Sequence, residues 1–127
     1  MANTTMKKIC FIAAAGMMLA TAAPVLAADC EVPTFQTADN RTVEGRMTVK
    51  AGKSCSVSMG TGAAGVSDPA ILKAPKNGSA RIQGFRAVYT PKKGFQGADS
   101  FTYTRFQNDR WGNRAQRTVD MKVEVVP

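Results

Sequence analysis

The sequence predicts an all-β fold, an antiparallel β-sandwich of about seven strands, from three observations. From Val43 onward apolar and polar residues alternate with a period of two, and no convincing stripe of helical period appears. Turn signals rich in glycine, proline and asparagine separate these runs about every eight to twelve residues. Two cysteines, Cys30 and Cys55, lie in the same part of the chain and can pin a small sandwich together.

Residues 1–27 are interpreted as a signal peptide that is cleaved on export. Lys7 and Lys8 form its positive end, residues 9–22 are almost wholly apolar, and small residues suited to signal peptidase follow. The apolar run is shorter than the ~20 residues that a membrane-spanning helix needs, so we expect no stable membrane insertion. The mature domain, residues 28–127, is therefore expected to be periplasmic or secreted.

Cleavage of this segment removes Cys10 and leaves two cysteines. In an oxidising compartment we expect Cys30 and Cys55 to form one disulfide, worth about 3 kcal/mol in the chain-entropy description of such a loop. Their spacing differs from that of Cys-x-x-Cys redox and metal motifs. Lipidation of Cys30 is not expected, because Asp29 stands where a lipid-attachment motif requires a small residue.

Two half-buried strands are expected in the first half of the mature chain. The apolar positions of the first are Val43, Gly45, Met47 and Val49. Those of the second, which alternate with serines, are Cys55, Val57 and Met59. Because successive side chains of a strand point to opposite faces, both sets are predicted to face the core.

The second half is expected to contain the remaining strands. The glycine-rich stretch 60–69 reads as a loop, and a short strand, 71–75, follows it. The tight-turn signal Asn77-Gly78 joins this strand to one around Arg81-Ile82, and Phe85–Tyr89 forms the next.

The last two strands flank a turn at residues 108–113. Phe101 and Tyr103 open the first of them, which is long. The final strand shows the clearest alternation, with apolar positions Val119, Met121, Val123 and Val125. No linker divides the chain, so residues 28–127 are expected to form one domain.

A family resemblance enters at the turns between these strands. The quoted motifs are the turn Pro75-Lys76-Asn77-Gly78, the strand end Tyr89-Thr90-Pro91, and the run Gly94-Phe95-Gln96-Gly97-Ala98-Asp99-Ser100-Phe101-Thr102-Tyr103. They make residues 71–126 resemble the bacterial Ig-like (cadherin-like) domains of large surface proteins. The resemblance implies an Ig-like sandwich with a scaffold or adhesion role and no catalysis.

The resemblance also implies structural roles for individual residues. Gly94 and Gly97 permit positive φ at a tight corner, and Phe95 plugs one end of the core. Asp99 caps loop amides, while Phe101 and Tyr103 fill the interior. The sequence departs from the family at Arg105, where an apolar residue is usual. Either a bulge there turns Phe106 inward, or a basic group has reached a sheet edge.

Composition narrows the functional classes. The chain has 17 basic and 9 acidic residues, a formal net charge of +8, and the predicted signal accounts for two of these charges. An exported basic protein is expected to meet an anionic envelope polymer, phospholipid head groups or an acidic protein, and not nucleic acid. Plain solubility is the alternative explanation of the charge. The chain has no histidine, which excludes Ser-His-Asp and Cys-His triads and imidazole metal sites.

No enzymatic activity is expected. Asp99 and Asp109 are the only carboxylates expected near a shared end of the sandwich, and each suits a turn. The alternating serines of residues 54–58 have no base beside them to activate a nucleophile. No cofactor is expected, and without a cluster of acidic residues neither is calcium or another metal.

The single tryptophan lies in an arginine-rich turn, which is the candidate binding surface. The candidate residues are Arg105, Arg110, Trp111, Arg114 and Arg117. Tryptophan and arginine are enriched at binding hot spots, and guanidinium groups bind carboxylate or phosphate bidentately. In the alternative interpretation Trp111 folds back over one end of the sandwich. Four loop lysines either extend a positive end or form a solvated rim: Lys73, Lys76, Lys92 and Lys93.

These observations favour a non-catalytic, exported binding module of the cell envelope. Its expected partner is an anionic polymer or acidic protein, docked through the basic, tryptophan-containing loop. One alternative is a structural or assembly subunit that pairs with a larger surface protein by strand-edge addition. Another is a small inhibitor of a secreted hydrolase that presents a rigid loop.

Overall fold

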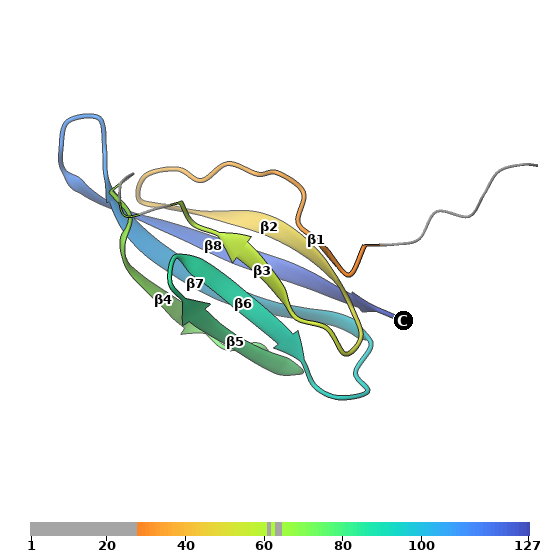
Figure 1. Ribbon diagram of the computed structural model, residues 1–127. Coiled ribbons are helices and arrows are strands. Elements are labelled where there is room, and N and C mark those ends of the chain that lie inside the picture. The colour runs from red at the N-terminus through yellow and green to blue at the C-terminus, as the bar shows by residue number, and fades with distance from the viewer. Residues whose placement is uncertain (1–27, 61, 63–64) are drawn as a thin grey trace, which may run out of the picture.

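The computed structural model describes residues 28–60, 62 and 65–127, so the expected signal peptide lies outside it. Within these residues the chain forms eight strands in two packed sheets (Figure 1). The strands are β1 (Cys30–Glu31), β2 (Arg41–Lys50), β3 (Cys55–Ser58), β4 (Ser67–Lys73), β5 (Gly78–Gln83), β6 (Arg86–Pro91), β7 (Gly97–Asn108) and β8 (Arg114–Val126). The predicted all-β sandwich is therefore confirmed.

The two sheets differ in size. The larger has the order β1-β2-β8-β7-β4 and the smaller the order β3-β6-β5. One pairing departs from the antiparallel expectation, because β2 lies parallel to β8, from Arg41 beside Arg117 to Lys50 beside Val126. The alternation of apolar and polar residues indicates which face of the sheet each side chain lies on. It is the same for parallel and antiparallel strands, so it could not reveal the parallel pairing of β2 and β8.

The core lies between the sheets and follows the predicted alternation. Met47 and Val49 of β2 are fully buried, as are the four alternating apolar residues of β8, from Val119 to Val125. The rings of Tyr89 and Phe101 stack with centroids 5.8 Å apart, and Tyr103 lies beside Phe101. The aromatic residues thus join β6 of the small sheet to β7 of the large one.

The region around β4 differs from the sequence prediction. Residues 67–69, expected in a loop, form the start of β4. This strand ends at Lys73 instead of the expected residue 75, and it pairs with β7. Pro69 lies within the strand, Asp68 has φ of 50°, and the register shifts twice along the pair. These irregularities break the period of two, so alternation could not identify the strand.

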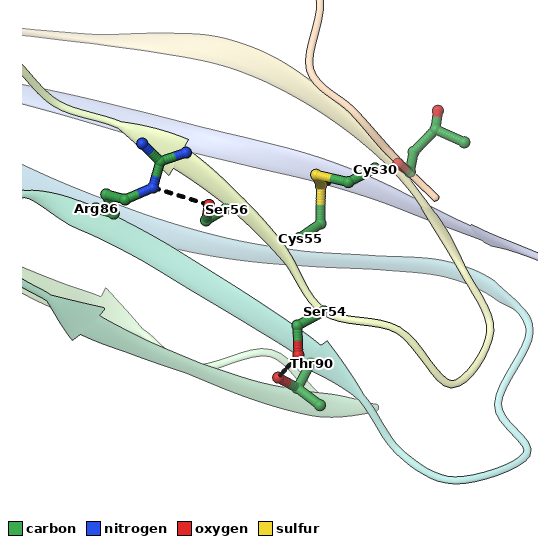
Figure 2. The surroundings of a disulfide bond; sticks show 7 residues. Cys30, Ser54, Cys55, Ser56, Arg86 and Thr90 are labelled. Carbon is green, nitrogen blue, oxygen red and sulfur yellow. Dashed lines mark hydrogen bonds between the residues drawn. A yellow bond between two sulfur atoms is a disulfide. The ribbon is translucent and has the colours of Figure 1, made fainter. Parts of the chain in front are cut away.

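The disulfide between Cys30 and Cys55 is confirmed, with Cα atoms 5.1 Å apart and a sequence separation of 25. Figure 2 shows it between β1 and β3. Because β1 is the edge of the large sheet and β3 the edge of the small one, the bridge ties the two layers together.

The corner between β6 and β7 is organised by one carboxylate. Gly94 and Gly97 have φ of 81° and 124°, a region that glycine enters without strain. Asp99 accepts hydrogen bonds from the backbone amides of Lys76 and Asn77, both 3.0 Å, and of Ser100, 2.9 Å. It also accepts one from the Tyr89 hydroxyl at 2.8 Å. Asp99 thereby joins the β4–β5 turn to the core.

Candidate functional site

The turn between β7 and β8, residues 109–113, projects beyond the sandwich at the end opposite the C-terminus (Figure 1). Asp109 closes it: its Oδ1 accepts hydrogen bonds from the amides of Trp111, 2.9 Å, and Asn113, 2.8 Å. The Asp109 amide donates to the Asn113 carbonyl, and Gly112 completes the turn with φ of 84°. The turn is therefore held by its own hydrogen bonds.

Trp111 lies at the tip of this turn with 76% of its surface exposed. The Arg110 guanidinium lies over the indole, with its Cζ atom 5.4 Å from the ring centroid, a cation–π contact. The alternative in which Trp111 covers the end of the core is therefore wrong. The turn presents a large apolar ring to solvent together with a positive charge.

Arg114 directly follows this turn and is the first residue of β8. Its guanidinium stacks over the Phe106 ring, with Cζ 3.9 Å from the centroid, and it pairs with Asp68 of β4. The Arg114 side chain is nevertheless 56% exposed. We call Arg110, Trp111 and Arg114 the hairpin tip.

Arg105 of β7 and Arg117 of β8 lie away from the hairpin tip, beside each other in the large sheet. Arg117 pairs with Asp39, with Nη2 2.7 Å from Oδ1, and donates to the Thr37 hydroxyl at 3.0 Å. Arg105 donates to the same hydroxyl at 3.1 Å and to Gln107 Oε1 at 3.1 Å. The five candidate residues are therefore divided between an exposed tip and an inner pair.

Arg105 matches neither of the two expectations for its position. It is 9% exposed, and the β7–β8 register runs without a shift through Arg105 beside Arg117 and Phe106 beside Gln116. The inward-facing place usual for an apolar residue is thus occupied by the guanidinium itself. Burial lowers the pKa of Arg105, the neighbouring Tyr103 opposes this shift, and the nearby charge of Arg117 adds to it.

The loop lysines do not extend the hairpin tip. The register places Gly78 beside Pro91 and Gly97 beside Val125, which puts the β4–β5 and β6–β7 turns at the C-terminal end. The four lysines Lys73, Lys76, Lys92 and Lys93 lie in or beside these turns and are exposed.

The two carboxylates expected near a shared end are also separated. Asp99 lies near the start of β7 and Asp109 just beyond its end. Ten residues of extended strand separate them by roughly 30 Å. They therefore cannot act as a catalytic pair, and each accepts turn amides instead.

Sequence reasoning missed a second basic surface, on the outer face of the small sheet. There Arg81 of β5 and Arg86 of β6 line a shallow hollow of about 430 Å³ with Ser54 and Ser56. Figure 2 shows the Arg86 Nε donating to the Ser56 hydroxyl, 3.0 Å. The available signal was that both arginines alternate with core residues and therefore point away from the core.

The part of the chain that the structure describes contains no group of three or more His, Cys, Asp or Glu side chains placed to hold a metal ion. No helix among those residues has the length and apolar character required to cross a membrane.

Comparison with known proteins adds one finding. A family model described as the bacterial Ig domain matches residues 20–122. No curated protein matches the chain. The match covers most of the sequence, including every strand except the end of β8.

Proposed function

We propose that this chain, which belongs to the bacterial Ig domain family, is an exported, non-catalytic binding module of the cell envelope. Its hairpin tip docks an anionic polymer or an acidic protein. The observation that carries the proposal is the exposure of Trp111, 76%, on a turn that is closed by its own hydrogen bonds.

The chemistry of the hairpin tip suits such a partner. A rigid, exposed indole can bury a large apolar area on contact, or stack on a sugar ring, with little further loss of conformational entropy. Among the described residues no carboxylate pairs with Arg110, so its charge is available to an incoming anion. Arg114 is paired with Asp68, but its exposed guanidinium retains further donors.

The disulfide supports export. A bond between Cys30 and Cys55 persists in an oxidising compartment and is rare in the cytosol. It also fixes the edge of the small sheet to the large one, at a distance from the hairpin tip. The tip therefore belongs to a pre-formed scaffold, which lowers the ordering cost of binding.

Co-sedimentation of the mature domain with isolated peptidoglycan, outer-membrane vesicles and soluble envelope protein tests the proposal. The variant is R110A/W111A/R114A, which removes two positive charges and the indole. The control is K92A/K93A, which removes two positive charges from the opposite end. At low salt we expect the wild type and the control to bind one fraction and the variant to lose at least tenfold in affinity.

The salt dependence of binding and the comparison of the two variants distinguish this proposal from strand-edge addition and from inhibition of a hydrolase. Binding through the tip is expected to weaken between low and physiological salt, because exposed charge pairs are screened. Equal loss in the variant and the control would contradict a specific tip, since it would reflect net charge alone. Binding that the variant retains in full would favour strand-edge addition or inhibition of a hydrolase.

The edges of the large sheet argue against strand addition at that sheet. Its edge strand β4 contains Pro69, two register shifts and a terminal lysine, Lys73, all of which oppose pairing with another strand. The other edge strand, β1, has only two residues, too few to support a long strand pairing, and the disulfide ties it to β3.

A further inference from the structure

A cavity of about 280 Å³ lies between the β1–β2 connection and strand β3. Its lining is mixed: Val32, Phe35 and Val57 contribute apolar side chains, and hydroxyl groups come from four further residues on the two sides, Thr34, Thr37, Ser56 and Ser58. Its inner end is lined by Tyr103 and Arg105 of β7. We call it the Arg105 cavity. It is separate from the hairpin tip and is not part of the function proposed above.

The charge at the inner end of this cavity lacks a counter-ion. Arg105 is nine-tenths buried, and its two hydrogen bonds go to neutral acceptors, Thr37 Oγ1 and Gln107 Oε1. In the described part of the chain the ion pairs leave Arg105 without a carboxylate, because Asp39 pairs with Arg117. The group formed by these three charged residues therefore retains one positive charge. Burying such a charge is unfavourable unless an anion compensates it.

The donors that remain face a ligand of defined chemistry. A guanidinium has five N–H donors, of which Arg105 uses two in the hydrogen bonds above. Three donors remain, and two of them can match the two oxygens of a carboxylate. Tyr103 lines the cavity beside Arg105, and no side-chain hydrogen bond of its hydroxyl occurs among the described residues, so this hydroxyl can donate to the same anion. The apolar side chains of Val32, Phe35 and Val57 suit a short hydrocarbon body.

We propose that the Arg105 cavity binds an organic carboxylate with a small branched or aromatic body. The carboxylate pairs with Arg105 and accepts a hydrogen bond from Tyr103, while the body packs between Phe35 and Val57. The volume lies just below the roughly 300–1,000 Å³ of drug-sized ligand pockets, so only a fragment-sized group is accommodated. Such a group is either a free small acid or the C-terminal residue of a peptide.

Strand β3 offers a place for a peptide ligand beside the Arg105 cavity. This strand pairs only with β6 among the described strands, so its other edge, next to the cavity, can accept main-chain hydrogen bonds. A peptide extended along that edge would place its terminal carboxylate at Arg105 and its last side chain in the cavity. Capture of a C-terminal carboxylate beside a strand edge is an established mode of peptide recognition.

Amide-proton and nitrogen NMR shifts of the mature domain test the proposal with matched probes. The small probes are isovalerate and its neutral analogue isovaleramide. The peptide probes are a five-residue peptide ending in valine as the free acid and the same peptide as the amide. We expect saturable shifts from the acids at Phe35, Val57, Ser58 and Arg105, and at least tenfold weaker binding of the amides.

Variants locate the contact. R105Q is expected to weaken acid binding at least tenfold and Y103F several-fold, whereas R114Q at the hairpin tip is expected to leave it unchanged. A peptide acid that binds tenfold tighter than isovalerate identifies a peptide terminus as the ligand, and equal binding identifies a free acid. The proposal is overturned if neither acid gives saturable shifts, or if the amides bind as well as the acids. It is also overturned if folded Y103F and R105Q both retain wild-type affinity.

Because R114Q removes a hairpin-tip residue, the two sites are tested independently. Loss of envelope binding in the R110A/W111A/R114A variant, with acid binding retained, would support both proposals. Acid binding without envelope binding in the wild type would refute the function proposed for the tip and leave the Arg105 cavity supported.

Discussion

Replacement of Asp99 by alanine is expected to destabilise the domain more than any other single change of an acidic residue. The Asp99 carboxylate accepts four hydrogen bonds, three from backbone amides and one from the Tyr89 hydroxyl. Alanine removes both carboxylate oxygens and with them all four hydrogen bonds. The hydroxyl of Tyr89, a fully buried residue, is then left without its partner.

The expected size of the effect follows from these contacts. The bond to the Lys76 amide is exposed, so water replaces it at little cost. The other three are partly buried, and at about 1 kcal/mol each their loss lowers the free energy of unfolding by about 3 kcal/mol. For a domain of this size that corresponds to a fall of about 12–24 °C in Tm.

Urea denaturation followed by circular dichroism measures the change. D120A is the matched control, because Asp120 is a strand aspartate whose contact is an exposed ion pair, 3.2 Å from Lys122 Nζ. It is expected to cost at most about 1 kcal/mol. A loss for D99A no larger than that for D120A would refute the view that Asp99 organises this end of the sandwich.

Three further predictions follow from the same structure. Reduction of the Cys30–Cys55 bridge is expected to lower the free energy of unfolding by about 3 kcal/mol; an unchanged urea midpoint would show that the crosslink adds no stability. Burial raises the pKa of Tyr103 to about 12, and burial with the Asp99 hydrogen bond raises that of Tyr89 further. Because the unfolded chain loses these protons near pH ~10, stability is expected to fall as the pH rises from about 10 through 12. Phenolate absorbance of the native protein should stay flat until about pH 11, and titration of either tyrosine near its ordinary value would contradict this. W111A is expected to lower the free energy of unfolding by at most about 1.5 kcal/mol, since only a quarter of the residue is buried. F101A removes a fully buried ring and is expected to lower it by about 3–5 kcal/mol. Equal losses in urea denaturation would show that Trp111 is packed.

The alternation of apolar and polar residues predicted the strands that bury one face along their whole length. In β2 and β8 the period of two is regular, because every second side chain enters the same core. Residues 67–69 were missed because Pro69 and the positive φ of Asp68 disturb that period. The parallel pairing of β2 and β8 was missed because a period of two carries no direction.

The candidate site was predicted in composition but not in arrangement. The sequence identified an arginine-rich turn around Trp111, and the exposure of this residue depends on the hydrogen bonds of Asp109, which spacing alone does not reveal. Arg105 was grouped with that turn because it is near in sequence. Its alternation with Phe101 and Tyr103 was the better signal, since it places all three on the inner face of β7.

The central claim is that Trp111 enters the contact with an anionic envelope partner, and its fluorescence tests this most directly. Trp111 is the only tryptophan of the chain, so its emission reports on the hairpin tip alone. The free domain is expected to emit as a water-exposed indole. On titration with the envelope fraction that it binds, at low salt, the emission should shift to the blue and acrylamide quenching should fall, and both changes should reverse at high salt. Binding that leaves the emission and the quenching of Trp111 unchanged would contradict the account.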